Sequence, residues 1–329
     1  MPAVSVVIVS WNGRQHLDNC LNAVAQQQGV DFETILVDNA STDGTVAYVR
    51  ERFPWVRVVA LDTNLGFAGG NNAGVREARG GCVAFLNNDT IADPGWLRAL
   101  LNGVDERGGF VLTTARIVYV HDARVIDSAG DGFLLAGGAF KRGHGAPSTA
   151  AGESREVFGV CGAAFLMPKR VFDELGGFDE DFFFSHEDVD LSYRARLLGY
   201  RCRYVAEATV RHHGGGTSGK TSPFAVLYGQ RNLEWVYLKN TPAGLLLRTL
   251  PAHLAYNVAA ALHFVRIGCF GAYVRGKLAA LKGLPRLLRK RAVVQSTRRV
   301  DSPALVSQME RRWLSMKLRE KRFDVALRD

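Results

Sequence analysis

Short apolar runs, mostly β-branched, alternate with helix-like segments through the first hundred residues. This alternation limits the possible folds more than any other feature of the sequence. Buried strands are expected in the apolar runs, at residues 4–9, 33–37, 56–60 and 82–86. Helices are expected between them, at 14–27, at 43–53, and from a Gly-rich turn at 65–70 to about Arg79. Such an order predicts an α/β fold with a mixed, mainly parallel sheet flanked by helices.

The charge of the chain is divided unevenly along its length. Residues 1–219 hold 20 Lys and Arg against 26 Asp and Glu, whereas residues 220–329 hold 21 against 6. The alternation of strands and helices ends near the same point, and basic sequence without strand-like alternation follows. We therefore expect an acidic α/β domain over 1–219, with halves at about 1–104 and 105–219, and a basic helical C-terminal region over 220–329.

Small polar and amide residues follow the first two predicted strands. Ser10, Trp11 and Asn12 come after the first strand, and Asp38 and Asn39 come after the second. Open α/β sheets bind ligands at the carboxyl ends of their strands, so these residues are candidates to face a nucleotide base or ribose. Taken singly, each is also typical of ordinary turns and helix caps.

A Gly-rich segment follows the third predicted strand. It runs from Asn64 to Gly74 and includes Gly69, Asn71 and Asn72. Glycines let a backbone approach a ligand closely. The spacing is not GxGxxG and the segment does not follow the first strand, which argues against a dinucleotide-dependent oxidoreductase.

The fourth predicted strand ends in Asn87-Asn88-Asp89. Asp89 offers one hard oxygen ligand, and Mg²⁺ or Mn²⁺ is often held by one or two protein ligands while substrate phosphates supply the rest. The alternative is a solvated turn.

A later block combines carboxylates with phenylalanines and ends in a His pair. His186, Glu187 and Asp188 stand at the predicted start of a helix, where the helix dipole favours an ionised carboxylate and apolar neighbours raise its pKa. A general base needs such tuning, although an acidic helix cap has the same pattern. Further on, His212 and His213 close a strand-like run and could present an imidazole to a metal.

Together these motifs resemble family 2 of the nucleotide-sugar glycosyltransferases, which have the GT-A fold, and in particular its bacterial rhamnosyltransferase-like branch. The resemblance covers about residues 4–216, in the order of the family. Its segments are 7–12, 36–45, 64–74, 85–89, 176–180 and 186–190.

The resemblance implies a role for each matching residue. Asp38 would pair with a pyrimidine base, Ser10 and Asn12 would surround the nucleotide, and Asp188 would be the catalytic base. Asp89 matches the last acid of the DXD metal motif, whose first acid is here an amide, and His212 would reach the metal, with His213 ranked second. The same resemblance places Asn39, Asn64, Gly69, Asn71, Asn72 and Asn88 around the nucleotide sugar, and Glu187, His186 and Trp11 beside the acceptor.

The implied activity is inverting transfer of one sugar with the help of Mg²⁺ or Mn²⁺. The branch suggests L-rhamnose from dTDP-rhamnose and a lipid-linked saccharide acceptor in cell-wall or surface polysaccharide assembly. UDP-galactofuranose and UDP-N-acetylhexosamine are alternative donors. A catalytically silent nucleotide-sugar-binding protein at the membrane is an alternative of another class.

The basic C-terminal region is expected to lie on an anionic membrane surface. Its longest uncharged run, 249–265, has 17 residues and contains Pro251, which makes a spanning helix improbable. The alternative is a helical subdomain packed on the catalytic domain. We expect no nucleic-acid partner, because no recognisable nucleic-acid-binding module is present. Scattered cysteines and the absence of a signal peptide favour a cytoplasmic protein, peripheral at the inner face of the plasma membrane.

Overall fold

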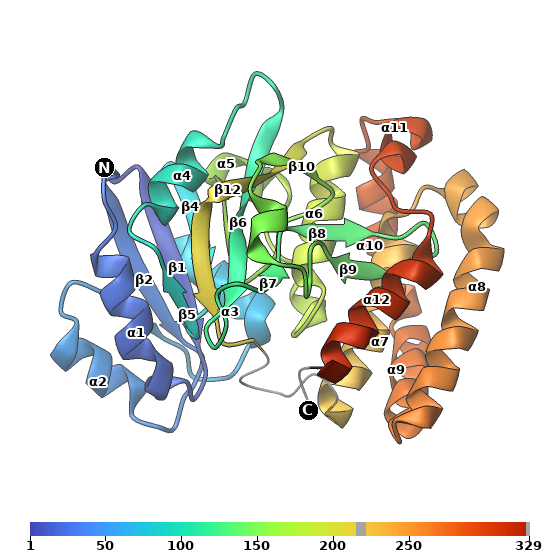
Figure 1. Ribbon diagram of the computed structural model, residues 1–329, viewed down its shortest axis with the longest axis horizontal. Coiled ribbons are helices and arrows are strands. Elements are labelled where there is room, and N and C mark those ends of the chain that lie inside the picture. Colours follow the sequence, from blue (N-terminus) through green and yellow to red (C-terminus); the bar gives the residue numbers. More distant parts are fainter. Residues whose placement is uncertain (215–221, 327–329) are drawn as a thin grey trace.

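The computed structural model describes residues 1–214 and 222–326, and these form a ten-stranded mixed sheet beside a group of helices (Figure 1). The strand order is β10-β12-β6-β11-β4-β1-β2-β3, with β5 beside β12 and β7 beside β6, and β8 and β9 form a separate hairpin-like pair. The strands are β1 (Val4–Ser10), β2 (Phe32–Asp38), β3 (Arg57–Ala60), β4 (Cys82–Leu86), β5 (Thr90–Ala92), β6 (Phe110–Tyr119), β7 (Ile126–Ser128), β8 (Asp131–Phe133), β9 (Ala139–Lys141), β10 (Arg155–Val157), β11 (Ala164–Pro168) and β12 (Arg201–His212).

The first half of the sheet is parallel and the second half is mixed. β3, β2, β1 and β4 run in parallel, as the alternation of strands and helices predicts. β11 then runs antiparallel to both β4 and β6, while β12 runs parallel to β6. The predicted fold class, a mixed and mainly parallel sheet flanked by helices, is confirmed.

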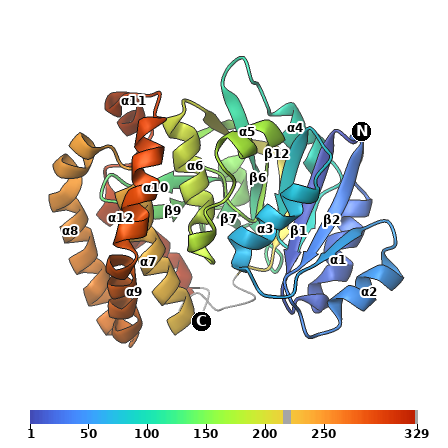
Figure 2. The ribbon, with the colours of Figure 1, turned by 180° about the vertical axis from the view of Figure 1, so that it is seen from behind.

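Helices cover both faces of the sheet and enclose one apolar core on each (Figures 1 and 2). Successive residues of β1 point to opposite faces, so that Val6 belongs to one core and Val7 to the other. The first core packs against α1 (Arg14–Ala25), α2 (Thr45–Arg52) and α4 (Trp96–Asn102). The second packs against α3 (Gly66–Glu77), α5 (Lys169–Glu174) and α6 (Glu187–Leu197).

The helix expected to follow a turn at 65–70 begins earlier than predicted. α3 begins at Gly66, and Gly70 and Gly74 lie against strands of the sheet. A Cβ at Gly74 would stand 2.4 Å from Val7 Cγ1 and 3.0 Å from Val37 Cγ2. The glycines are therefore used for close packing of helix on strand, despite their low helix propensity.

The C-terminal region forms six helices in the described residues, α7 (Pro223–Asn240), α8 (Ala243–Arg266), α9 (Phe270–Lys282), α10 (Leu284–Ser296), α11 (Ser302–Ser307) and α12 (Trp313–Ala326). They pack beside the sheet around a third core that also includes Phe133, Phe158 and Tyr193. Among the described residues, no helix is long and apolar enough to cross a membrane. The expected boundary between residues 219 and 220 lies outside the described part of the chain.

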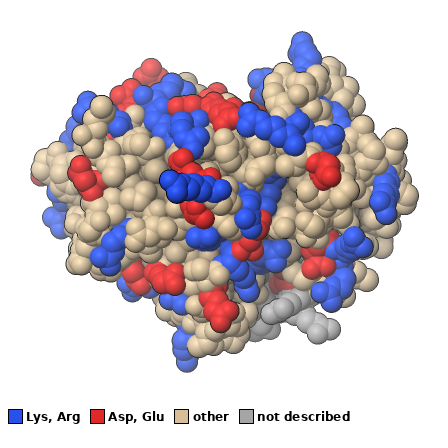
Figure 3. All heavy atoms as spheres, turned by 90° about the horizontal axis from the view of Figure 1, so that it is seen from above, with Lys and Arg blue, Asp and Glu red and all other residues tan. Residues whose placement is uncertain are grey.

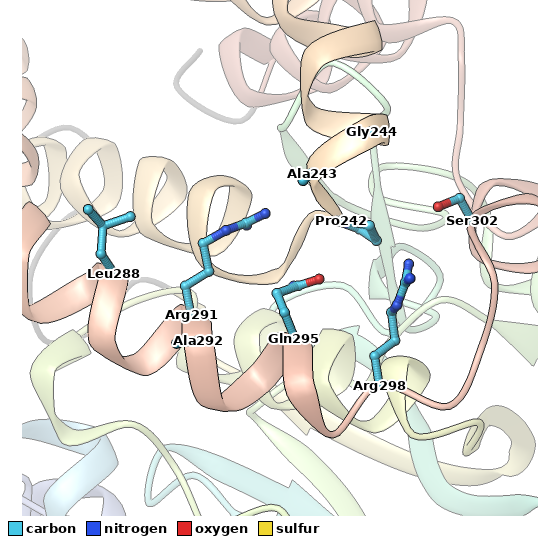
Figure 4. Close-up of a pocket in the computed structure, with 9 residues that line it drawn as sticks. All are labelled: Pro242, Ala243, Gly244, Leu288, Arg291, Ala292, Gln295, Arg298 and Ser302. Atoms are coloured by element: carbon cyan, nitrogen blue, oxygen red, sulfur yellow. The ribbon is translucent and has the colours of Figure 1, made fainter.

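Two side chains of α10 cap the C-terminal end of α7. Arg291 donates to the carbonyls of Leu238 and Thr241, the latter at 2.7 Å, and Gln295 donates to that of Asn240 at 2.9 Å. Figure 4 shows both side chains pointing from α10 toward Pro242, at the start of α8. These bonds satisfy carbonyls that the last turn of a helix leaves without partners.

The close packing of α3 can be tested by comparing two glycines inside helices. Gly74→Ala forces a methyl group into Val7, so we expect it to lower the free energy of unfolding by about 1–3 kcal/mol. Gly229, inside α7, has no atom within 4 Å of an added Cβ, so Gly229→Ala is expected to stabilise by about 0.5–1 kcal/mol. Urea unfolding of both variants measures the difference, and equal stability of the two would contradict the packing argument.

Candidate active site

The turns that follow β1 and β2 are bonded to each other where the two strands end. The side-chain Oδ1 of Asn12 accepts from the Thr42 N–H at 2.8 Å, and the backbone N–H of Asn12 donates to Ser41 Oγ at 2.9 Å. Asn12 and Ala40 have left-handed backbone, with φ of 50° and 62°, which non-glycine residues keep only where surrounding contacts enforce it. The two turns therefore hold each other in place at the carboxyl ends of β1 and β2, the edge at which open α/β sheets bind ligands.

Asp38 carries an unused acceptor at this edge. Its side chain is buried, Oδ2 accepts from the Ser41 N–H at 3.1 Å, and Oδ1 has no hydrogen-bond partner among the described residues. A buried carboxylate oxygen without a donor is a place for a ligand N–H or O–H. Nearby, Ser10 is fully buried and bonded to Asn88 at 3.1 Å, while Trp11 is 45% exposed.

The asparagines around the Gly-rich segment hold backbone in place. Asn39 donates to Asn64 Oδ1 (2.9 Å) and to the Gly66 carbonyl (3.0 Å), and accepts from the Leu65 N–H. Asn72 bonds both backbone groups of Phe178, each at 2.9 Å. Asn71 bonds its own helix, and Gly69 lies on α3 against Leu65. In the structure these residues, predicted to line the nucleotide-sugar site, contact other parts of the protein, and their contact with a nucleotide sugar stays a prediction.

Asp89 and His212 meet across β5 and β12. His212 Nε2 lies 3.3 Å from Asp89 Oδ1, and both side chains are buried. On the other side of the ring, Nδ1 lies 2.9 Å from Oδ2 of Asp127, which is also paired with Lys141 at 2.8 Å. His213 is exposed and lies beside the His16 ring instead.

His212 is thus held between two carboxylates, an arrangement that also orients imidazoles at metal sites. Asp127 fixes Nδ1, which directs Nε2 toward Asp89. Burial alone would lower the pKa of His212, but hydrogen bonds and charge from Asp127 and Asp89 raise it to about 9. Among the described residues, no group of three or more His, Cys, Asp and Glu side chains is arranged to hold a metal ion. Asp89 and His212 are the two side chains here that could contact a cation, and a substrate or water would have to supply the other positions.

The segment before α6 is strained. Phe183, Ser185 and His186 have φ of 59°, 71° and 68°, so three of four consecutive non-glycine residues are left-handed. The Phe183 carbonyl accepts from the Phe67 N–H at 2.7 Å, and an added Cβ at Gly66 would stand 2.2 Å from the same oxygen. The strained loop therefore rests directly on the start of α3.

A single amide of α7 holds this loop from the other side. Asn232 is fully buried, and its Nδ2 lies within hydrogen-bond distance of the carbonyls of Phe182 (2.9 Å), Phe184 (2.8 Å) and Ser185 (2.7 Å), which share its two N–H groups. Next to it, Arg231 donates to the carbonyl of Asp181 at 2.7 Å. These hydrogen bonds to the loop backbone offset the strain of its left-handed residues, which would otherwise cost about 1–3 kcal/mol for each residue.

Asp188 lies directly after the loop, in the first turn of α6. The Asp188 carboxylate accepts from the Gly162 N–H at 2.7 Å and from the Val189 N–H at 2.8 Å, and it is only partly buried. Burial raises its pKa above the usual value, and the two N–H groups offset only part of that rise. Asp188 is thus a fixed carboxylate whose proton affinity is increased.

Two neighbouring carboxyl groups share the surroundings of Asp188. Burial and then the charge of Asp188 raise the pKa of Glu187 to about 8, so Glu187 is protonated at pH 7. The same two causes raise the pKa of Asp131 well above its usual value. His186 stays neutral at pH 7, because burial lowers its pKa to about 4.

Two hydrogen bonds link the segment that carries Asp188 to the segment that carries Asp89. Gly162 bonds Asp188, and the next residue, Ala163, accepts from the Asn87 N–H at 2.9 Å. The turn at 162–163 thus joins Asp188 to the Asn87-Asn88-Asp89 sequence. Asp188 and Asp89 are therefore candidates for one shared site, in which a carboxylate could accept a proton and the Asp89–His212 pair could bind a cation.

Three residues of this site were not found from the sequence: Asp127, Asp131 and Asn232. Asp127 and Asp131 lie near or in a Gly-rich stretch that resembles a loose loop, and Asn232 lies in the basic helical region. Their roles depend on contacts with residues that are far away in the sequence. Asp127 and His212, for example, are 85 positions apart.

The sequence and the fold were compared with known proteins. Residues 5–176 match Glycosyl transferase family 2. A relative from Mycobacterium tuberculosis, N-acetylglucosaminyl-diphospho-decaprenol L-rhamnosyltransferase, is 28% identical over 269 residues, which cover 73% of this chain and 85% of the relative.

Solved glycosyltransferases share the fold. The mannosyltransferase PcManGT of Pyrobaculum calidifontis, in complex with GDP-Man and Mn²⁺, superposes with a TM-score of 0.54 at 18% identity, covering 98% of this chain and 86% of that one. Staphylococcus aureus TarS 1–349, in complex with UDP, gives a TM-score of 0.52 at 19% identity, covering 89% and 88%. The family match, which spans more than half of the chain, confirms the prediction from the sequence motifs. This protein belongs to glycosyl transferase family 2 and is a glycosyltransferase of the GT-A fold, similar to rhamnosyltransferases.

Proposed function

We propose that the protein transfers one sugar, with inversion, from a nucleoside-diphosphate donor to an acceptor hydroxyl, with Asp188 as the general base. The observation that carries the proposal is the joining of Asp188 to the Asn87-Asn88-Asp89 turn through residues 162–163. This junction brings a carboxylate of raised pKa to the same edge as the groups suited to a donor diphosphate.

The donor would lie along the ends of β1, β2 and β4. The unpartnered Oδ1 of Asp38 suits an N–H of a pyrimidine base, and Ser10 and Asn12 shape the turns beside it. L-Rhamnose from dTDP-rhamnose is the proposed sugar, supported by the mycobacterial relative. UDP-galactofuranose and UDP-N-acetylhexosamine are the competing donors.

Asp89 and His212 would hold Mg²⁺ or Mn²⁺. Two observations support this role: the oriented imidazole, and the Mn²⁺ in the PcManGT complex. When bound, the cation neutralises charge on the departing diphosphate. The second carboxylate, Asp127, keeps the imidazole in position. Because Asn87 stands where the DXD motif has its first acid, the protein itself would supply only two ligands to the cation.

Asp188 acts on the acceptor. As the acceptor oxygen attacks the anomeric carbon, its proton passes to the Asp188 carboxylate, and the bond from that carbon to the diphosphate oxygen breaks on the opposite face. The sugar is transferred in one displacement, so no covalent sugar–enzyme intermediate forms. A base so placed contributes about 10²–10⁴ in rate.

The proposed acceptor is a lipid-linked saccharide, as the name of the mycobacterial relative suggests. Residues 1–219 would carry catalysis, and residues 220–329 would place the enzyme at the inner face of the plasma membrane. The pairing of an acidic catalytic part with a basic C-terminal part supports this division of roles.

Incubating the protein with a panel of nucleotide sugars, with and without Mn²⁺, tests the function. We expect donor cleavage that requires the cation and is fastest with dTDP-rhamnose. Asp188→Asn should lower transfer about 10²–10⁴-fold and leave the donor Kd unchanged, because the carboxylate acts on the acceptor. Cleavage of none of the donors, or near-normal turnover by Asp188→Asn, would contradict the proposal.

The pH dependence of kcat/KM tests Asp188 separately. A base must be ionised, so the rate should fall as pH falls through the pKa of Asp188, at a higher pH than for an ordinary aspartate. Glu187→Gln should leave this acid limb in place, because Glu187 is already neutral below its pKa of about 8. An acid limb that moves in Glu187→Gln would assign the titration to Glu187 instead.

A further inference from the structure

α8 presents an apolar face to solvent along its whole length. Six large aliphatic side chains are between 37% and 71% exposed, at positions 247, 250, 254, 258, 262 and 265. Their spacing of three or four residues places them in one row, which we call the α8 stripe. With a rise of 1.5 Å per residue, the row is about 27 Å long.

The stripe is not the side by which α8 packs on the protein. Leu245, Thr249 and His253 are buried on the opposite side, where His253 bonds Glu234 at 2.9 Å and stacks on Tyr237. In an ordinary surface helix the outward side would be polar. Here the exposed side chains of α8 are apolar except for Arg248 and Arg266, which stand near its two ends.

The sequence that forms and follows α8 is strongly basic. Residues 235–300 contain twelve Lys and Arg and no Asp or Glu. Arg248, Arg266, Arg275 and Lys282 are exposed, and no salt bridge to them is found within the described part of the chain. In Figure 3 the right-hand end of the molecule, where the C-terminal helices lie, shows mainly uncharged atoms, with several Lys and Arg and a few Asp and Glu among them.

We infer that the α8 stripe lies in the surface of an anionic lipid bilayer, with α8 parallel to the membrane plane. Apolar side chains would enter the acyl boundary, and the arginines at the ends of the helix would meet lipid phosphates, as in helices that lie in the interface. This inference extends the proposed function, because a lipid-linked acceptor is held in such a surface.

Charge favours lipid over a second copy of the chain. A two-fold contact through the stripe would bring the same surface of both copies together. Because residues 235–300 offer no carboxylate, the arginines of one copy would face arginines of the other unpaired. An anionic bilayer supplies the opposite charge, which a copy of this surface cannot.

Vesicle flotation of the full-length protein tests the inference without any need for activity. The stripe variant carries Leu254→Gln, Val258→Asn and Leu262→Gln, and the control is Trp55→Gln, an exposed residue that lies between α2 and β3. The wild type and the control should float with vesicles of equal parts phosphatidylglycerol and phosphatidylcholine, less so at high salt, and weakly with phosphatidylcholine alone. The stripe variant should bind the anionic vesicles at least about tenfold more weakly.

Equal flotation of the stripe variant and the wild type would overturn the inference, as would no flotation of the wild type. A wild type that forms dimers in solution which the stripe variant abolishes would assign the face to a second copy instead. Thermal unfolding of the stripe variant near the wild-type temperature excludes misfolding. Donor cleavage measured without vesicles should be unchanged in the stripe variant, so failure of the inference and failure of the proposed function give different results.

Discussion

The hydrogen bonds from the Asn232 amide to three carbonyls are the interaction on which the rest of this active site depends. The loop from Phe182 to His186 has left-handed residues that would relax if left alone. Asn232 holds it on one side and the start of α3 supports it on the other. Because α6 begins directly after the loop, the position of Asp188 follows from these contacts.

The same contacts make α7 part of the active site, although it lies beyond the expected boundary of the catalytic part. Lys239 is buried between Asp179 and Asp190, at 2.6 and 2.8 Å, and Asn240 bonds Asp190 at 2.8 Å. Two side chains of α7 thus hold both ends of the acidic block, and Asn232 holds the loop between them. The basic C-terminal region would therefore support the proposed catalysis through α7, and α8 would be free for the proposed contact with lipid.

Local patterns in the sequence predicted much of this structure. The parallel strands follow from β-branched runs, and the start of α6 at Glu187 follows from acids before a helical repeat. The start of α3 was missed because residues 65–70 have the composition of a turn, whereas contacts such as that of Gly74 with Val7 depend on the tertiary structure. Pairs such as Asp127 with His212 have no local signal, because the sheet topology brings them together. The role of Asn232 could not be predicted from the sequence for the same reason.

The central claim is that Asn232 positions the base. Single-turnover transfer at saturating donor tests it most directly, with Asn232→Ala compared with Gln295→Ala, an amide that bonds two carbonyls at the far end of α7. We expect Asn232→Ala to slow transfer by about 10–10² while the donor Kd stays unchanged, because the base is displaced and the donor site is not. Gln295→Ala should transfer at the wild-type rate. A folded Asn232→Ala protein with the wild-type single-turnover rate would contradict the account.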